Sequence, residues 1–287
     1  MFIRVISANV VFSEIRAALV HTLKTRYKNI KHKLEIKKEK SNTVYILFDI
    51  PNYKGLIPKT YIVYQFEQTS TSPWFTDRYM TILRNAYQVW DYSKVNIKWL
   101  TEQDITTCVH VPYCYSDVLD YYRSDDDQAI DVLFYGAMNE RRERILKAIS
   151  AKGLKVVVCT KPFYGIERDE LNCKAKIVLN IHFYKPGILQ TSRLVPLISN
   201  SIFCVSEPCD REQETNVEYK SYCILACEEE LPSVCLEWCS KGPSSRQAFA
   251  KKAYELFKKT KMESVFPWTE VNLENLSIHQ PLNILNQ

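Results

Sequence analysis

The chain has 287 residues, of which 46% are hydrophobic and 25% are charged, with a formal net charge of +5. This balance is typical of a folded globular protein, and the length suits one large domain or two domains of about 130 to 150 residues. No apolar run approaches the roughly 20 residues that cross a bilayer, and we interpret the start, MFIRVISANVVF, as a strand rather than a signal peptide. We therefore expect a soluble protein of the cytoplasm.

Apolar, strand-like runs alternate with helical patterns in the first part of the chain. We expect strands at 2–6, 43–50, 60–68, 88–91 and 106–113, and helices at 13–27, capped by Ser13, and from 76 up to the fourth strand. Such alternation is typical of a parallel sheet with helices on both faces. The basic segment 24–40 is interpreted as the end of the first helix and a solvated loop, and a nucleic-acid surface is its alternative.

The same alternation restarts after a polar, acidic segment at 121–130, which we interpret as a linker between domains. The Asp125–Asp127 run lies in this linker and is interpreted as solvated charge. The second part predicts strands at 131–135, 154–159, 176–183 and 201–207, and helices at 139–151, 167–175, 188–200 and 244–261. Two α/β sheets in tandem are the simplest account.

Ten cysteines are scattered through the chain. There is no C-x2-C pair, and no histidine lies near enough in sequence to complete a zinc site. A chain of this length does not need a disulfide framework. The pattern favours free thiols in a reducing compartment.

Gly136, one of only six glycines, directly follows the strand DVLFY. Glycine there lets a ligand approach the backbone at the carboxyl end of a strand, where α/β proteins bind ligands. If Asn139 caps the next helix, Arg141 and Arg142 fall in its first turn, where a cation costs about 0.3 to 1 kcal/mol. With a diphosphate bound there, the two arginines would stabilise the helix start instead of destabilising it. In the alternative, the flanking glutamates neutralise both arginines on a solvated surface.

A second candidate is NIHFYKPGILQTSR at 180–193. His182 lies at a predicted strand end, and Tyr184, Gln190 and Arg193 bring hydrogen-bonding groups to the same place. Glu207 closes the next strand and is suited to accept hydrogen bonds from ribose or sugar hydroxyls. A buried structural histidine is the alternative for His182.

In the first half, the strand ends carry carboxylates and aromatic rings, a combination that suits sugar binding. Glu67 lies near the end of the predicted strand TYIVYQFEQ, Trp74 follows that strand, and Asp91 ends the strand QVWD. Trp90 is interpreted as a core residue.

The order FYGAMNERRERILKAI, KIVLNIHFY and ILQTSRLVPLISNSIFCVSE resembles the donor half of GT-B glycosyltransferases. It is most similar to the short glycosyltransferase-like proteins of bacteria and large DNA viruses. YIVYQFEQ and FTDRYMTILRNAYQVWDYSKVNI resemble the acceptor half. The resemblance extends from about residue 44 to residue 260, and the order of the motifs carries it.

This resemblance implies an α/β GT-B fold, in which two Rossmann-like domains with parallel sheets face each other across a cleft. It implies an acceptor-side domain at 1–122, a nucleotide-sugar-binding domain at 123–243, and a helix and tail at 244–287 that pack back on the first domain. The implied activity is transfer of a sugar from a nucleoside-diphosphate sugar to a glycan or protein. We expect no cofactor, no essential metal and no nucleic-acid partner, and no D-x-D motif of the metal-dependent type occurs.

The strand-end pattern and the resemblance together give three groups of site residues. The expected donor-binding residues are Gly136, Asn139, Arg141, Arg142, Phe163, Tyr164, Gly165, His182, Tyr184, Gln190, Arg193 and Glu207. The catalytic candidates are Glu67, Asp91 and His182, and the acceptor-side candidates are Asn9, Gln68, Trp74 and Tyr92.

Gln190 departs from the family pattern, because many relatives place a glutamate there. A neutral amide binds hydroxyls but cannot act as a carboxylate. The alternative function is therefore a catalytically inactive GT-B-like module that binds a nucleotide or a glycan.

Overall fold

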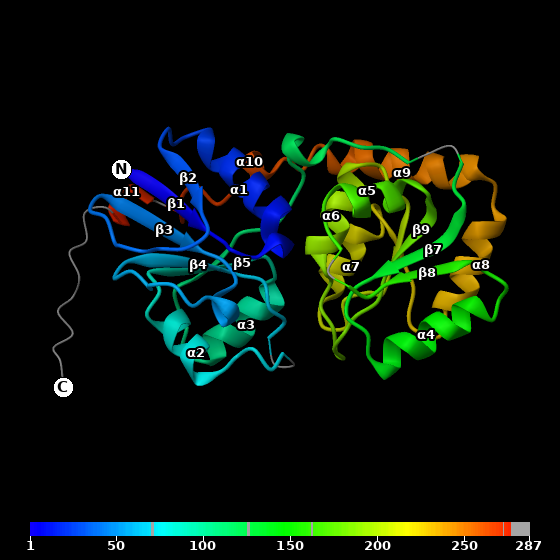
Figure 1. The fold of residues 1–287 in the computed structure, drawn as a ribbon, viewed down its shortest axis with the longest axis horizontal. Coiled ribbons are helices and arrows are strands. Elements are labelled where there is room, and N and C mark those ends of the chain that lie inside the picture. Colours follow the sequence, from blue (N-terminus) through cyan, green and yellow to red (C-terminus); the bar gives the residue numbers. More distant parts are fainter. Residues whose placement is uncertain (70–71, 125–126, 162, 272, 277–287) are drawn as a thin grey trace. The chain divides into compact units, whose positions relative to one another are not determined.

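A computed structural model describes residues 1–69, 72–124, 127–161, 163–271 and 273–276 (Figure 1). The chain divides into two compact units, each with one parallel sheet. Unit 1 contains Met1–Pro112 and the segment from Glu263 onward, and unit 2 is Tyr113–Met262. No helix in the described part of the chain is long and apolar enough to cross a membrane.

Unit 1 is built on a six-stranded parallel sheet in the order β2-β1-β3-β4-β5-β6. Its strands are β1 (Phe2–Ile6), β2 (Ile30–Lys33), β3 (Thr43–Leu47), β4 (Tyr61–Gln65), β5 (Gln88–Asp91) and β6 (Cys108–His110). The helices are α1 (Ser13–Lys24), α2 (Asp77–Arg84) and α3 (Lys94–Glu102), with α10 (Met262–Val265) and α11 (Leu273–Leu276) near the end of the chain. Short 3-10 helices lie at η1 (Val10–Phe12) and η2 (Ile50–Asn52).

The two faces of this sheet are covered differently. α1 lies on one face, and α2 and α3 lie on the other (Figure 1). The core on the α2 and α3 side includes Tyr45 and Leu47 of β3 together with Leu83 of α2 and Leu100 of α3. These helices are amphipathic, so burying their apolar stripes supplies most of their stability.

Unit 2 has a five-stranded parallel sheet in the order β11-β10-β9-β7-β8. Its strands are β7 (Ile130–Tyr135), β8 (Val156–Cys159), β9 (Ala175–Asn180), β10 (Cys204–Ser206) and β11 (Ile224–Leu225). Its helices are η3 (Asp117–Leu119), α4 (Glu140–Ser150), α5 (Ile166–Cys173), α6 (Thr191–Ser199), α7 (Gln213–Tyr219), α8 (Leu231–Ser240) and α9 (Pro243–Phe257). α4 packs against α8, and α6 packs against α9 (Figure 1).

The expected α/β class with two parallel sheets is confirmed, and Trp90 is a fully buried core residue. All ten cysteines are free, as the sequence predicts. The prediction of a helix end and a loop for the basic segment 24–40 was wrong in part, because β2 lies inside this segment and pairs with β1. Ser13 does not cap α1; the N-cap residue is Phe12, and Ser13 is the first helical residue.

The units divide at Pro112 and Tyr113, earlier than the boundary we expected at residues 122 and 123. The segment after residue 112 is tied to unit 2 because the side chain of Asn200 accepts the backbone N–H groups of Tyr121 and Tyr122, at 2.9 and 2.8 Å. Two residues of the expected linker, 125 and 126, lie outside the described residues.

The expected 244–287 element is divided between the units. α9 belongs to unit 2, where the hydroxyl of Tyr254 donates to Asp120 at 2.6 Å. The later segment belongs to unit 1, where the Trp268 ring lies 4.1 Å from the guanidinium carbon of Arg26.

Candidate functional site

Gly136 in unit 2 occupies a position that only glycine suits. It follows β7 with a φ of +140°, and a Cβ there would lie 3.0 Å from Nη2 of Arg193 and 3.4 Å from Nη1 of Arg142. Any other residue is strained at this φ, and its Cβ would force the two guanidinium groups to shift. Two guanidinium groups from two different helices therefore converge on the carboxyl end of β7, an interior strand of the sheet.

Arg142 is buried and is held by backbone carbonyl groups. Asn139 caps α4 as predicted, because its side chain accepts the Arg142 N–H at 2.9 Å. The guanidinium donates to the carbonyl oxygens of Ala137 at 2.7 Å and of Ile181. Burial first, and then the charge of Arg193, lower the pKa of Arg142 to about 9. The charge of this arginine is thus oriented but not neutralised by an ion pair.

Arg193 enters the same place from the first turn of α6. Its guanidinium carbon lies 4.8 Å from the Tyr135 ring centroid and 5.7 Å from that of Phe134. Its Nη1 atom is shielded from solvent and has no hydrogen-bond partner among the described residues. Burial lowers the pKa of this arginine. A shielded guanidinium nitrogen without an acceptor marks a position where an anion fits.

Arg168 of α5 completes a group that we call the arginine cluster: Arg142, Arg168 and Arg193. Arg168 is buried and pairs with Asp169, with Nη2 and Oδ1 2.7 Å apart. Its charge contributes to lowering the pKa of Arg193, after burial, so the two guanidinium groups are electrostatic neighbours. Neither Arg142 nor Arg193 forms an ion pair within the described part of the chain, and the cluster therefore carries uncompensated positive charge.

Arg141 and Glu207 differ from their expected roles because they bind each other. Arg141 donates through both terminal nitrogens to the buried Glu207 carboxylate, and it also pairs with Glu228 at 2.8 Å. Burial opposes ionisation of Glu207, but Arg141 and His182 outweigh it and lower the pKa of this carboxyl. Of the two arginines at the start of α4, Arg141 is neutralised by carboxylates, whereas Arg142 has no ion pair among the described residues.

His182 is a fully buried residue, in line with the structural alternative for it. Its Nε2 lies 2.8 Å from the carbonyl oxygen of Pro208, so Nε2 carries the proton and donates. A Cβ on Gly187 would lie 2.5 Å from Cγ of the imidazole, so the glycine backbone covers the ring. Burial is the main cause that lowers the pKa of His182. A neutral, covered imidazole supports the loop after β9 and is poorly placed for proton transfer with a substrate.

The remaining donor-side residues surround the arginine cluster or border it. The Phe163 ring centroid is 6.4 Å from that of Tyr135, and burial raises the pKa of Tyr164, which Arg193 and Arg168 lower in part. Gly165 starts α5 with a φ of +70°. Tyr184 packs edge-on against Phe183, with ring centroids 4.9 Å apart.

Gln190 directly precedes α6, three residues before Arg193. Its Oε1 is shielded and has no hydrogen-bond partner in the described ranges. An amide oxygen in this state is a free acceptor for a hydroxyl group of a ligand.

In unit 1, the two carboxylates that were expected to be catalytic have different surroundings. Asp91 is fully buried and accepts hydrogen bonds from Gln65 Nε2 at 2.6 Å and from the Ser93 N–H at 2.7 Å. Burial raises its pKa well above the usual value. Asp91 therefore fixes the loops after β4 and β5 from inside the protein. Glu67 is only partly buried. Burial is the main cause that raises its pKa; a hydrogen bond with Ser72 opposes this, and the charge of Asp49 adds a smaller increase.

The acceptor-side residues lie on the loops that follow the strands of the same sheet. Asn9 caps η1 and donates to Asp49 Oδ2 at 2.9 Å. Gln68 is buried, whereas Trp74 is 42% exposed. The Tyr92 ring stacks on Phe66, with centroids 5.3 Å apart and an interplanar angle of 10°.

Sequence reasoning missed Arg168 and Asp49. Arg168 lies inside a predicted short helix, and nothing in the local pattern shows that its side chain reaches the end of β7. Asp49 gives a better signal, because it follows the strand TVYILF immediately before Ile50 and Pro51. Its φ of +50° is unusual for a residue other than glycine.

No family model matches the chain. It is 35% identical over 159 residues to the uncharacterized protein R358 of Acanthamoeba polyphaga mimivirus, and the match covers 54% of each protein. It is 29% identical over 166 residues to the uncharacterized protein L140 of the same virus, which covers 50% of this chain and 53% of that protein. The chain therefore spans about half the length of the curated relatives that it matches.

The structure is similar to the crystal structure of TarM, a GT-B glycosyltransferase. The TM-score is 0.55, and the alignment covers 84% of this chain and 56% of TarM at 10% identity. An identity this low shows the fold alone. The chain thus has a GT-B-like α/β fold made of two Rossmann-like units with parallel sheets of six and five strands.

Proposed function

We propose that this chain is a glycosyltransferase that uses a nucleoside-diphosphate sugar, and that the arginine cluster of unit 2 binds the donor diphosphate. The observation that carries this proposal is the shielded Nη1 of Arg193, which has no acceptor among the described residues. It lies beside Arg142, a second buried guanidinium without an ion pair. Two such charges in one place are costly unless an anion compensates them.

A diphosphate fits this position for geometric reasons as well. Gly136 presents backbone without a side chain, and α6 points its N-terminal end toward the same strand end, where its dipole favours an anion. Guanidinium groups bind phosphate oxygens through paired N–H donors. Each charge-assisted hydrogen bond contributes about 1.5 to 3 kcal/mol.

The same groups suit the chemical step. As the bond between the sugar and the diphosphate breaks, negative charge grows on the leaving diphosphate, and fixed cations stabilise that charge. The free Oε1 of Gln190 accepts a hydrogen bond from a sugar hydroxyl. Glu67 is the proposed base for the acceptor hydroxyl, because its carboxyl is only partly buried and its pKa is raised, which makes the carboxylate a stronger base than that of an ordinary glutamate. No metal is assigned a role.

The first test is a thermal-shift screen against nucleoside diphosphates and nucleotide sugars. A ligand at a hundredfold excess over its Kd adds about 2.7 kcal/mol, which raises the Tm by about 5 to 10 °C for a domain of this size. A rise with diphosphates of one base, but not with the matching nucleoside, supports the diphosphate site. If no compound of either set raises the Tm, the proposal is wrong.

A second candidate function is a catalytically inactive module that binds the same donor. Two features favour the inactive module: position 190 is a glutamine rather than a glutamate, and Asp91 is fully buried, away from a substrate. Release of nucleoside diphosphate from the donor separates the two functions. Donor binding without release, with and without a panel of glycan acceptors, would favour the inactive module.

A further inference from the structure

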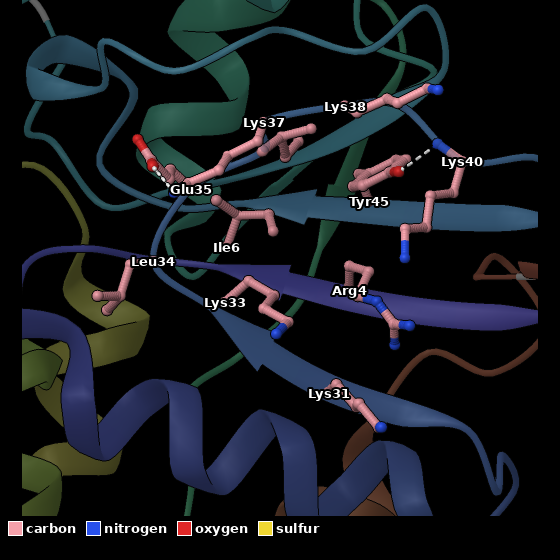
Figure 2. Close-up of a pocket in the computed structure, with 11 residues that line it drawn as sticks. Arg4, Ile6, Lys31, Lys33, Leu34, Glu35, Lys37, Lys38, Lys40 and Tyr45 are labelled. Atoms are coloured by element: carbon pink, nitrogen blue, oxygen red, sulfur yellow. Dashed lines mark hydrogen bonds and ion pairs between the residues drawn. The ribbon is translucent and has the colours of Figure 1, made fainter.

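A basic groove lies on one face of the unit 1 sheet, at its β2 edge. Arg4 of β1 is in register with Lys31 of β2 and with Tyr45 of β3. Paired residues of parallel strands point to the same face, and so do residues two positions apart, which adds Ile6 and Lys33 to this surface. The segment 34–40 passes beside the same face and borders the groove (Figure 2). Its volume is about 650 Å³, within the range of small-molecule sites.

The lining of this groove is strongly cationic. It contains one carboxylate, Glu35, against six cations: Arg4, Lys31, Lys33, Lys37, Lys38 and Lys40. In the described ranges the only ion pair of these cations joins Lys37 to Glu35, at 3.7 Å and with the lysine side chain 86% exposed. Six minus one leaves five positive charges, which equals the net charge of the whole chain. The formal charges of all other residues thus sum to zero, and the excess positive charge of the chain is concentrated in this groove.

The backbone that frames the groove is held in place. The Ile36 N–H donates to the Tyr53 hydroxyl at 2.9 Å, and the Lys40 N–H donates to the Tyr45 hydroxyl at 2.8 Å. Ile36 is buried in the core, so the 34–40 segment is anchored at its middle and at its end. In Figure 2 the Lys40 side chain extends from this segment toward Arg4 of β1, so cations border the hollow on two sides.

Packing does not require these cations. Over β3 and β4, the same face of the sheet is covered by α2 and α3 with apolar residues. Over β1 and β2 the segment 34–40 lies beside this face instead, and the outward positions Arg4, Lys31 and Lys33 are charged. Like charges placed this close repel each other, so the unliganded groove is electrostatically unfavourable and an anion relieves that repulsion.

We propose that this groove binds a compact ligand that carries several phosphate groups. Lysines bind phosphates as point charges, and the number of cations calls for more than one phosphate. Base stacking, on which single-stranded nucleic acids depend, is not offered, because the Tyr45 ring is only 2% exposed. A flat membrane surface does not fill a concave site. This site lies in unit 1 and is a second ligand site, separate from the donor site of unit 2.

The test measures binding of inositol hexakisphosphate by calorimetry at about 50 and 200 mM salt. The groove variant is K31Q/K33Q/K40Q, and the control is K54Q/K94Q/K98Q, which makes the same charge change at exposed positions of the same unit. We expect the groove variant to lose at least tenfold in affinity and the control less than twofold. Affinity of the unchanged protein falls as salt rises.

Three outcomes would overturn the proposal. The first is no binding at low salt, and the second is equal loss in both variants, which means general charge attraction. The third is tighter binding of a twelve-nucleotide single strand than of the phosphorylated probe, which makes the surface a nucleic-acid site. All six substituted lysines are exposed, so loss of folding does not obscure the comparison. The R193M variant, which removes a guanidinium of the donor site, should bind the probe normally, so failure of one site is distinguishable from failure of the other.

Discussion

Replacing Arg193 with methionine should have opposite effects on stability and on ligand binding. Methionine keeps the length and apolar stem of the side chain and removes its charge. The shielded, unpaired guanidinium nitrogen is a cost in the unliganded protein. Relief of that cost, less about 0.5 to 1 kcal/mol for the lost contact with the Tyr135 ring, should leave R193M about 1 kcal/mol more stable.

The magnitudes translate directly into measurements. A gain of about 1 kcal/mol raises the Tm by about 2 to 4 °C for a domain of this size. Loss of one charge-assisted bond of about 1.5 to 3 kcal/mol weakens nucleoside-diphosphate binding by about 10- to 150-fold. Melting without ligand and calorimetry with the diphosphate found in the screen give both numbers. R211M, at an exposed arginine of the same unit, is the control and should change neither by much.

The reasoning is refuted if R193M melts lower than the unchanged protein and binds the diphosphate equally well. That result would make Arg193 a structural cation held by the Tyr135 and Phe134 rings. A gain in stability together with a loss of binding is the signature of a residue kept for its ligand.

Three other variants test the neighbouring features. Gly136→Ala should weaken diphosphate binding at least tenfold, because its Cβ would lie 3.0 Å from Nη2 of Arg193, whereas Gly153→Ala, with a positive φ of +84° and open space around it, should lose only stability; equal affinity in both variants would contradict this. Glu207→Gln should lower the free energy of unfolding by about 1.5 to 3 kcal/mol at pH 7, because Arg141 loses the Glu207 carboxylate and keeps only its pairing with Glu228. Because the folded pKa of Glu207 is lowered, its contribution is present above the unfolded pKa of about 4.3 and is lost as pH falls through the folded pKa, so denaturation at pH 3 should show a smaller difference than at pH 7. Glu67→Gln should lower transfer by about 100- to 10,000-fold, and the rate of the unchanged enzyme should rise with pH through a pKa above 4.5; transfer within a few-fold of normal would remove Glu67 as the base.

Much of the fold follows from the local pattern, because buried strands of parallel sheets are continuous apolar runs. TVYIL, YIVYQ, IDVLFY and AKIVLN are of this kind, and all were predicted as strands. β2 was missed because IKHK has one apolar residue in four, which is the composition of an edge strand that exposes one face. The spatial order of the strands is set by packing between distant segments, so the local pattern does not contain it.

The candidate site shows the same division between local and distant information. The Asn139 cap and the position of Gly136 at a strand end could be predicted, since both depend on a few consecutive residues. The pairing of Arg141 with Glu207 could not, because 66 positions separate them and only the sheet order brings them together. Adjacent arginines on a helix point about 100° apart, so Arg142 turns inward to carbonyl groups while its neighbour meets a carboxylate.

The chain leaves unit 1 at Pro112 and re-enters it at Glu263, so unit 2 is an insertion within the sequence of unit 1. Unit 1 is completed by this late segment, in which the Phe266 ring lies 5.7 Å from that of Trp90 and the Glu270 carbonyl accepts from Gln88 at 2.8 Å. During synthesis, the inserted unit is therefore available in full before the unit that precedes it. Trp90 of β5 is made early, but it gains its Phe266 contact only when some of the last described residues have been synthesised.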